Sequence, residues 1–188
     1  MVTISSLWLP ILLSGVFVFI LSSIIHMVFK YHNNDFGKLP SEDRILESLR
    51  GFDIPPGEYV LPCASDMKTM GTPEFIEKCT KGPVAFMTFK KPGPPTMTGS
   101  LIMWFIYSLV IAVFAAYLTG RTLAPGAEYL AVFRIAGATS FFCYVVAGWQ
   151  NSIWYKRRWS TTVKHSIDGL IYALVSAGTF AWLWPTGL

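Results

Sequence analysis

An uninterrupted apolar segment near the start of the chain, Leu7 to Phe29, limits what this sequence can fold into. It contains no Asp, Glu, Lys or Arg. At a rise of about 1.5 Å per residue, a helix of this length crosses a hydrocarbon layer of about 30 Å. Three further apolar runs follow, at residues 100–118, 130–149 and 167–184. Because each run has about the length of one membrane crossing, we predict an all-α membrane protein with four transmembrane helices.

The composition supports a lipid environment and argues against a nucleic-acid partner. Hydrophobic residues make up 53% of the 188 residues and charged residues only 14%, which is too apolar for an ordinary soluble domain. Nine of the 15 basic residues lie between residues 30 and 97, where nine acidic residues balance them. The net charge of +4 therefore forms no basic face, and we expect the lipid bilayer as partner and no nucleic acid.

Residues 30–97 mix charges, prolines and glycines, so we predict a small mixed α/β water-facing insert between the first and second spans. If all four runs cross the membrane, the insert shares one side with a basic loop, residues 156–164. Both termini then lie on the other side. Because Lys and Arg near span ends stay in the cytoplasm, we expect the insert to be cytoplasmic and both termini periplasmic.

The insert has signals for four short elements. Ser41 is expected to cap a helix that Gly51 ends, and Thr72-Pro73-Glu74 is expected to open a second helix. Residues 59–62 and 84–89 are β-prone and are expected to pair as a two-stranded ribbon. A unit of this size has a thin core, so we expect it to lean on the membrane helices or on a partner.

Two sets of small or polar residues recur at four-residue steps and mark helix-packing faces. Ser14, Ser22 and His26 are separated by multiples of four residues and share one face of the first span, which lines a transport path or, more commonly, packs against another helix. Gly169, Ala173 and Ala177 form a small-residue face on the fourth span. Such a face lets a second helix approach closely, either the third span or a neighbouring subunit.

The predicted topology brings three histidines to the insert side of the membrane. His26 and His32 lie at the end of the first span, and His165 and Asp168 at the start of the fourth. Imidazole and carboxylate together bind transition metals or relay protons, and Asp35 is a further candidate for this cluster. The alternative is structural: these are interfacial groups satisfied by helix contacts, water or lipid headgroups.

The sequence contains no catalytic motif. We find no GxxxxGK[ST], GxGxxG, HExxH or GxSxG pattern, and no Cys/His spacing typical of zinc. The sequence therefore assigns no reaction, and it favours a protein that is not an enzyme without deciding the question.

Several segments resemble a family of small, uncharacterised bacterial multi-pass inner-membrane proteins of unknown function. They are Ser23 to His32, Lys38 to Asp43, Arg121 to Gly126, and Asn151 to Trp154. The resemblance implies a location in the bacterial inner membrane and assigns no site residue.

Three functions remain open from the sequence. The first is a non-enzymatic structural or accessory component that self-associates or joins other membrane subunits, with the insert as docking surface. The second is a metal-binding or redox membrane protein that uses His26, His32, His165 and Asp168. The third is a small oligomeric channel or transporter.

Overall fold

The computed structural model describes residues 1–186, which are mostly helical and form two compact units. The first unit, here called the helix unit, contains Met1–Phe36 and the chain from Thr96 onward. The second unit contains Gly37–Pro95 and corresponds to most of the predicted insert. The seven residues from Lys30 to Phe36, which the composition assigned to the insert, belong to the helix unit. They do so because the side chains of Tyr31, His32 and Asp35 contact α8, as described below.

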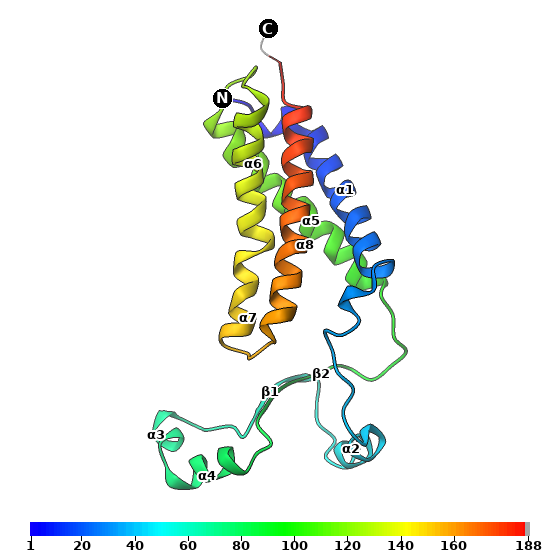
Figure 1. Ribbon diagram of the computed structural model, residues 1–188, viewed down its shortest axis with the longest axis vertical. Helices are drawn as coiled ribbons and strands as arrows, with labels where there is room; N and C mark the ends of the chain where they lie inside the picture. Colours follow the sequence, from blue (N-terminus) through cyan, green and yellow to red (C-terminus); the bar gives the residue numbers. More distant parts are fainter. Residues whose placement is uncertain (187–188) are drawn as a thin grey trace. The chain divides into compact units, whose positions relative to one another are not determined.

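The helix unit is a bundle of long helices that run alternately up and down (Figure 1). A 3₁₀ turn, η1 (Ile4–Leu7), leads into α1, and the short helices η3 (Val146–Trp149) and α7 (Gln150–Ile153) continue α6. The long helices are α1 (Trp8–Met27), α5 (Thr98–Thr122), α6 (Tyr129–Tyr144) and α8 (Trp159–Trp182).

Three helical segments in residues 1–186 are long and apolar enough to cross a membrane: Ile4–Met27, Thr98–Thr122 and Tyr129–Ile153. They contain or overlap the first three predicted spans. The fourth predicted span lies in α8, which forms as a helix but is not among these three. Lys164, His165 and Asp168 make the first half of α8 too polar, so the prediction of four spans is not confirmed.

The end of the bundle that holds the chain's N-terminus has an apolar core, here called the apolar end. The backbone N–H of Val2 donates to the carbonyl of Gly120 (2.9 Å), which fastens the first residues against α5. A Cβ on Gly120 would lie 2.6 Å from the Val2 carbonyl oxygen, so this approach requires glycine. The buried members of this core are Val2, Leu7, Ala112, Ala115, Ala116, Val132, Ala136, Phe180, Ala181 and Trp184.

The small-residue face of α8 packs against α6 of the same chain. A Cβ on Gly137 of α6 would lie 3.0 Å from the Cβ of Ala177, and a Cβ on Gly169 would lie 2.6 Å from Val145 Cγ2. Ala173 is also buried. Of the two partners left open by the sequence, the structure shows the third long helix of the same chain.

The second unit contains three short helices and one ribbon. Its elements are α2 (Glu42–Arg50), β1 (Gly57–Leu61), α3 (Met67–Met70), α4 (Pro73–Lys81) and β2 (Ala85–Phe89). The predicted pairing is confirmed, because β1 and β2 run antiparallel with Tyr59 opposite Met87.

The cap prediction for Ser41 was wrong. Ser41 precedes α2, but its backbone is left-handed (φ 53°) and its side chain accepts no cap hydrogen bond. Thr72 does cap α4 by accepting from the Phe75 N–H. No residue between Gly37 and Pro95 is buried, so this unit has no core of its own.

Candidate metal centre

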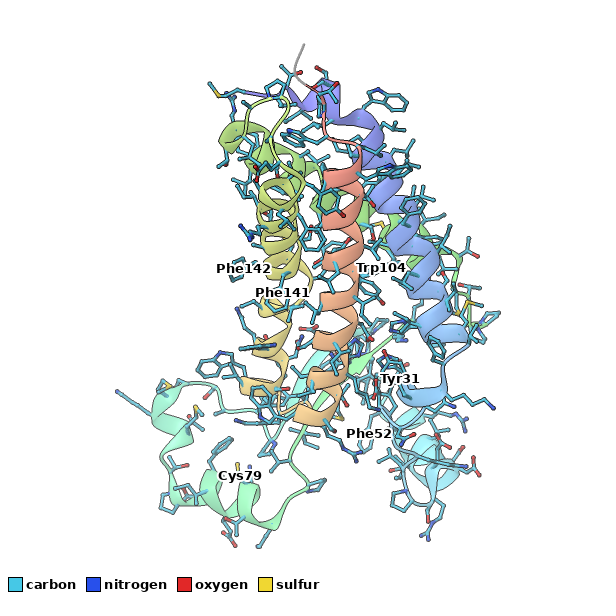
Figure 2. The ribbon with its side chains drawn as sticks, turned by 45° about the horizontal axis from the view of Figure 1, so that its top comes forward. Tyr31, Phe52, Cys79, Trp104, Phe141 and Phe142 are labelled. Atoms are coloured by element: carbon cyan, nitrogen blue, oxygen red, sulfur yellow. The ribbon has the colours of Figure 1, made fainter. Side chains whose placement is uncertain are left out.

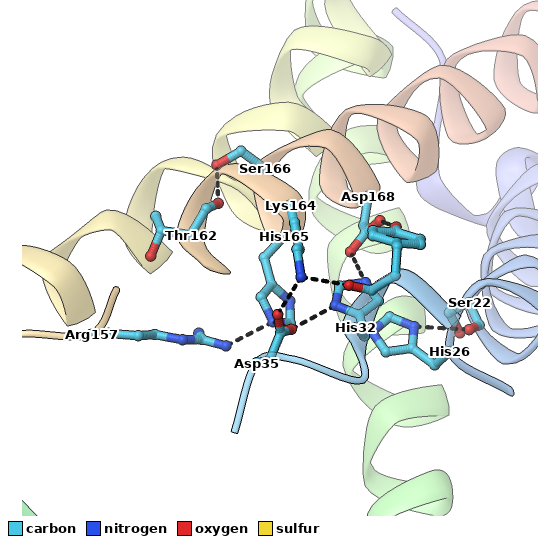
Figure 3. Close-up of polar contacts among 11 residues, drawn as sticks. Ser22, His26, His32, Asp35, Arg157, Thr162, Lys164, His165, Ser166 and Asp168 are labelled. Carbon is cyan, nitrogen blue, oxygen red and sulfur yellow. Dashed lines mark hydrogen bonds and ion pairs between the residues drawn. The ribbon is translucent and has the colours of Figure 1, made fainter. Parts of the chain in front are cut away.

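A cluster of histidines and carboxylates lies where α1 ends and α8 begins, here called the histidine end (Figure 3). His26 comes from the last turn of α1, and His32 from the 3₁₀ turn η2 (Lys30–His32) that follows it. Asp35 follows this turn, and His165 and Asp168 lie in the first half of α8.

His32 lies between two carboxylates. Its Nδ1 is 2.7 Å from Asp35 Oδ2, and its Nε2 is 2.9 Å from Asp168 Oδ2. An ionised carboxylate only accepts hydrogen bonds, so the contact with Asp35 places a ring proton on Nδ1, and in the neutral ring the lone pair is then on Nε2. The contact between Nε2 and Asp168 Oδ2 lacks the geometry of a hydrogen bond, and both atoms are buried.

His26 has the same proton arrangement. Its Nδ1 lies 3.0 Å from the carbonyl oxygen of Ser22, one turn earlier in α1, which can only accept. The lone pair of His26 is therefore on Nε2. The ring stacks on that of His32, with centroids 4.5 Å apart and planes 7° from parallel. Both imidazoles thus have Nδ1 fixed by an acceptor and Nε2 available as a ligand.

Asp168 is the most deeply buried member of the cluster, with 1% of its surface exposed. Its Oδ1 accepts a hydrogen bond from the Tyr31 hydroxyl, and its Oδ2 has no hydrogen-bond partner. Among residues 1–186 no Lys or Arg lies within ion-pair distance of Asp168. Burying a carboxylate without a neighbouring cation costs free energy. The basic group in contact with Asp168 is His32.

Asp35 has the opposite electrostatic environment. Lys164 Nζ lies 2.9 Å from Asp35 Oδ1 and also donates to the Tyr31 carbonyl oxygen. Burial alone would raise the pKa of the Asp35 carboxyl, but the hydrogen bonds from Lys164 and His32 outweigh it and hold the pKa below its ordinary value. Asp35 is therefore an ionised anchor that orients the His32 ring.

His165 is engaged by a cation. Its Nε2 lies 2.7 Å from a guanidinium nitrogen of Arg157 and 3.6 Å from Asp35 Oδ2. Because arginine stays protonated in proteins, it donates here and occupies the Nε2 lone pair of His165. His165 is thus a weaker candidate ligand than His26 or His32.

Two overlapping groups have ligand atoms within 4.8 Å of one another: His26, His32 and Asp168, and His32, Asp35 and His165. The second group already contacts Lys164 and Arg157. A metal ion there would add positive charge beside two cations. The first group has a buried negative charge and no such cation, so it is the better cation site.

The structure brings together part of the cluster that the sequence predicted. His26, His32 and Asp168 come together, whereas His165 lies in the adjoining group with Asp35. Sequence reasoning missed Tyr31 and Lys164, which hold Asp168 and Asp35. Tyr31 and Lys164 each precede a candidate ligand in the sequence, and this neighbourhood is the signal by which they could have been found.

The predicted packing serines are both buried in α1. Ser22 accepts a hydrogen bond from Trp104 Nε1 of α5 (2.7 Å), and Ser14 Oγ has no hydrogen-bond partner in the described chain. Figure 2 shows Trp104 between α1 and α8. Ser22 therefore makes two contacts: its hydroxyl accepts a hydrogen bond from Trp104, and its carbonyl oxygen accepts one from His26.

No family model, no curated protein and no solved structure matches this chain.

Proposed function

We propose that this chain is a membrane protein that binds one divalent transition-metal ion at the histidine end. The ligands are Nε2 of His26, Nε2 of His32 and the carboxylate of Asp168. This ligand set is smaller than the one expected from the sequence, because His165 is not among the ligands.

One observation carries the proposal: His32 Nε2 and Asp168 Oδ2 lie 2.9 Å apart without a hydrogen bond between them. With a single His32 proton on Nδ1, two buried acceptor atoms lie close together without a proton between them. Such an arrangement needs a cation, either a proton shared by the pair or a metal ion bound by both. Two ligand atoms of one ion commonly lie about this far apart, since metal–ligand bonds of about 2.0–2.1 Å place them about 3 Å apart.

The surroundings of the two histidines support a metal more than a proton. Ligating histidines typically donate their other ring N–H to a carboxylate or a backbone carbonyl, which fixes the tautomer and the ring orientation. His32 donates to Asp35 and His26 donates to the Ser22 carbonyl, so both kinds of anchor occur here. The ring of His26 is exposed, and because it stacks parallel to that of His32, it has to leave this stack before its Nε2 points at an ion held by the other two.

The ligand set indicates which metals fit. Two imidazoles and one carboxylate favour Zn²⁺, Fe²⁺ or a related first-row ion over Ca²⁺ or Mg²⁺, which prefer all-oxygen sites. Three protein ligands also leave at least one coordination position open for water or another molecule.

The membrane arrangement belongs to the same proposal. We place α8 as a fourth span in the bacterial inner membrane, with the insert in the cytoplasm and both termini in the periplasm. The helix is long enough, and its polar first half faces the cluster rather than lipid, as Asp168 and Tyr31 illustrate. The basic residues Lys156, Arg157 and Arg158 then lie on the cytoplasmic side.

The test is metal content of the untagged chain extracted from native membranes into lipid particles. We expect about one Zn²⁺ or Fe²⁺ per chain by elemental analysis, and retention of added Zn²⁺ after gel filtration. His32→Gln and Asp168→Asn should each weaken Zn²⁺ binding at least 100-fold, roughly the effect of removing one of three ligands. Asp43→Asn, an exposed carboxylate change in the insert, is the matched control and should bind as the natural chain does.

Two results would contradict the proposal. A chain that stays metal-free after loading with Zn²⁺, Fe²⁺, Co²⁺ and Mn²⁺ would make a shared proton the explanation of the His32–Asp168 pair. Equal binding by Asp168→Asn and Asp43→Asn would place the metal elsewhere. Gel-filtration profiles of the variants show whether a loss of metal reflects a loss of fold.

A second candidate, an accessory role through the insert, rests on a separate observation. No residue between Gly37 and Pro95 is buried, and Phe52, Ile76 and Phe86 expose half or more of their surfaces. Such a unit gains stability from a partner that covers it, either a second copy or another membrane subunit. Mass determination of the native lipid particle tests this: a mass equal to one chain, with nothing co-purifying, removes the accessory role.

A further inference from the structure

A cavity of about 450 Å³ opens beside the proposed metal ligands, within the helix unit. His26, His165 and Asp168 form its polar end, and residues of α1, α5, α6 and α8 line the rest. Exposed Met27, Met97 and Leu101 lie at its rim. A ligand in the surrounding lipid can therefore reach the cavity from the side of the bundle.

Four aromatic rings make the wall next to the polar end: Trp104, Tyr107, Tyr144 and Tyr172. They contact one another, with centroids 5.9 Å apart for Trp104 and Tyr172 and 5.6 Å apart for Tyr144 and Tyr172. Aromatic walls of this kind favour a planar ring through stacked and edge-to-face contacts. A saturated acyl chain has no ring and makes none of these stacked or edge-to-face contacts.

Two buried polar atoms at the cavity have no hydrogen-bond partner: the Tyr172 hydroxyl and Asp168 Oδ2. Tyr172 is 3% exposed and Asp168 1%. Unpaired buried polar groups are costly, and a ligand that pairs with them gains both affinity and orientation. A hydroxyl group on the ligand suits both, because it can accept from Tyr172 and turn its oxygen to an ion held by Asp168.

The side chains that line the cavity offer no cation to a charged head group. No Lys or Arg is among the residues that line this cavity in residues 1–186, and Asp168 contributes a negative charge. From the protein's side chains alone, a phosphate or carboxylate head would meet no counter-charge. With the proposed metal ion bound, the aromatic wall decides, and it favours a hydroxylated ring joined to an apolar tail that follows the rim to the lipid.

From these observations we infer that the cavity binds a lipid-soluble hydroxylated aromatic ring, of the quinol class. The ring stacks among Trp104, Tyr144 and Tyr172. One ring hydroxyl takes the open coordination position of the metal and accepts a hydrogen bond from Tyr172. The inference rests on the proposed metal site for the position of this hydroxyl, and on the cavity for the ring and the tail.

The experiment measures equilibrium binding of a radiolabelled benzoquinol with a ten-carbon tail, under anaerobic conditions, to the Zn²⁺-loaded chain in lipid particles. The same ten-carbon tail on a phosphocholine head is the competitor. We expect saturable binding of one quinol per chain, with the competitor at least 20-fold weaker. Metal content is measured on the same sample.

Two pairs of variants locate the ligand. Leu101→Trp fills the cavity at its rim and should abolish quinol binding, whereas Val113→Trp adds the same ring on an exposed part of α5 outside the cavity and should leave it unchanged. Tyr172→Phe removes the unpaired hydroxyl and should weaken quinol binding about 10-fold. Tyr117→Phe, an exposed tyrosine of the same bundle, should have no effect. All four variants should keep one metal ion per chain.

The outcomes separate the two proposals. A chain that holds its metal but binds quinol no better than the phosphocholine competitor overturns this inference and leaves the proposed function intact. Unchanged binding by Leu101→Trp also overturns it, because the ligand then lies elsewhere. A chain without metal in the same assay overturns the proposed function, and with it the place of the ring hydroxyl.

Discussion

The two ends of the helix bundle are built from the same four helices but from different chemistry. At the apolar end, small residues such as Ala112, Ala115 and Ala136 let the helices close around Phe180. At the histidine end the helices surround a cavity, and titratable side chains fill the gap between α1 and α8. The difference indicates that the apolar end supplies most of the stability and leaves the histidine end free to keep unpaired polar groups.

The largest effect is expected at the apolar end, from Phe180→Ala. Phe180 is fully buried, and its truncation leaves a cavity costing about 3 kcal/mol in free energy of unfolding. For a chain of this length we expect the melting temperature in detergent to fall by about 6–12 °C. Metal content at 4 °C should not change. Phe142→Ala, on an exposed face of α6, is the control and should melt within about 2 °C of the natural chain.

Asp35→Asn tests the histidine end through a residue that positions a ligand. The variant keeps the shape but weakens the acceptor that orients the His32 ring. We expect Zn²⁺ affinity to fall about 10–100-fold, equal to about 1.4–2.7 kcal/mol, as for other residues that support a ligating histidine. Zn²⁺ titration against a competing chelator measures this. A loss no larger than that of Asp43→Asn would show that Asp35 does not orient His32.

Gly169→Ala probes the point where the two ends meet on α8. The new methyl would lie 2.6 Å from Val145 Cγ2 and 3.2 Å from the Tyr144 carbonyl oxygen, so the helices must separate. We expect a loss of about 1–2 kcal/mol in stability, together with weaker Zn²⁺ binding by the adjacent Asp168. Gly178→Ala on the same helix meets only the Tyr129 hydroxyl, at 3.7 Å. It should raise stability by about 0.5–1 kcal/mol through helix propensity, so thermal melts of the pair should shift in opposite directions.

Tyr31→Phe should give the smallest change. It removes the hydroxyl that donates to Asp168 Oδ1 and leaves the proposed metal ligands in place. We expect Zn²⁺ affinity to fall about 5–10-fold, since Asp168 loses one of its orienting contacts, worth about 1 kcal/mol. Chelator competition against Tyr117→Phe measures the difference. An effect as large as that of Asp35→Asn would mean that Tyr31 itself is a ligand.

The sequence predicted the parts of this molecule that depend on local pattern. The lengths of the apolar runs located α1, α5 and α6, and β-propensity located the ribbon of β1 and β2. The polar first half of α8 was harder, because its side chains are satisfied by residues far away in the chain. Ser41 was misread because its backbone is left-handed, whereas a capping residue typically has an extended backbone, and its side chain makes no cap hydrogen bond.

The site was predictable to the level of topology and not to that of side-chain contacts. The predicted topology put the end of α1 and the start of α8 on the same side of the membrane, which placed His26, His32 and Asp168 near one another. Which ring nitrogen is free depends on the Ser22 carbonyl and on Asp35, and these are matters of rotamer and distance. The pairing of His165 with Arg157 was likewise invisible without coordinates.

The contact between Tyr31 and Asp168 joins residues 137 positions apart in the chain, and this separation governs when the site can form. At synthesis rates of about 5–20 residues per second, Asp168 follows Tyr31 out of the ribosome by about 7–27 seconds. During this interval α1 is made, but His26, His32 and Asp35 lack both Asp168 and Lys164. The cluster is therefore completed only after α8 has been made, and a nascent chain arrested before α8 has His26 and His32 without Lys164, His165 and Asp168.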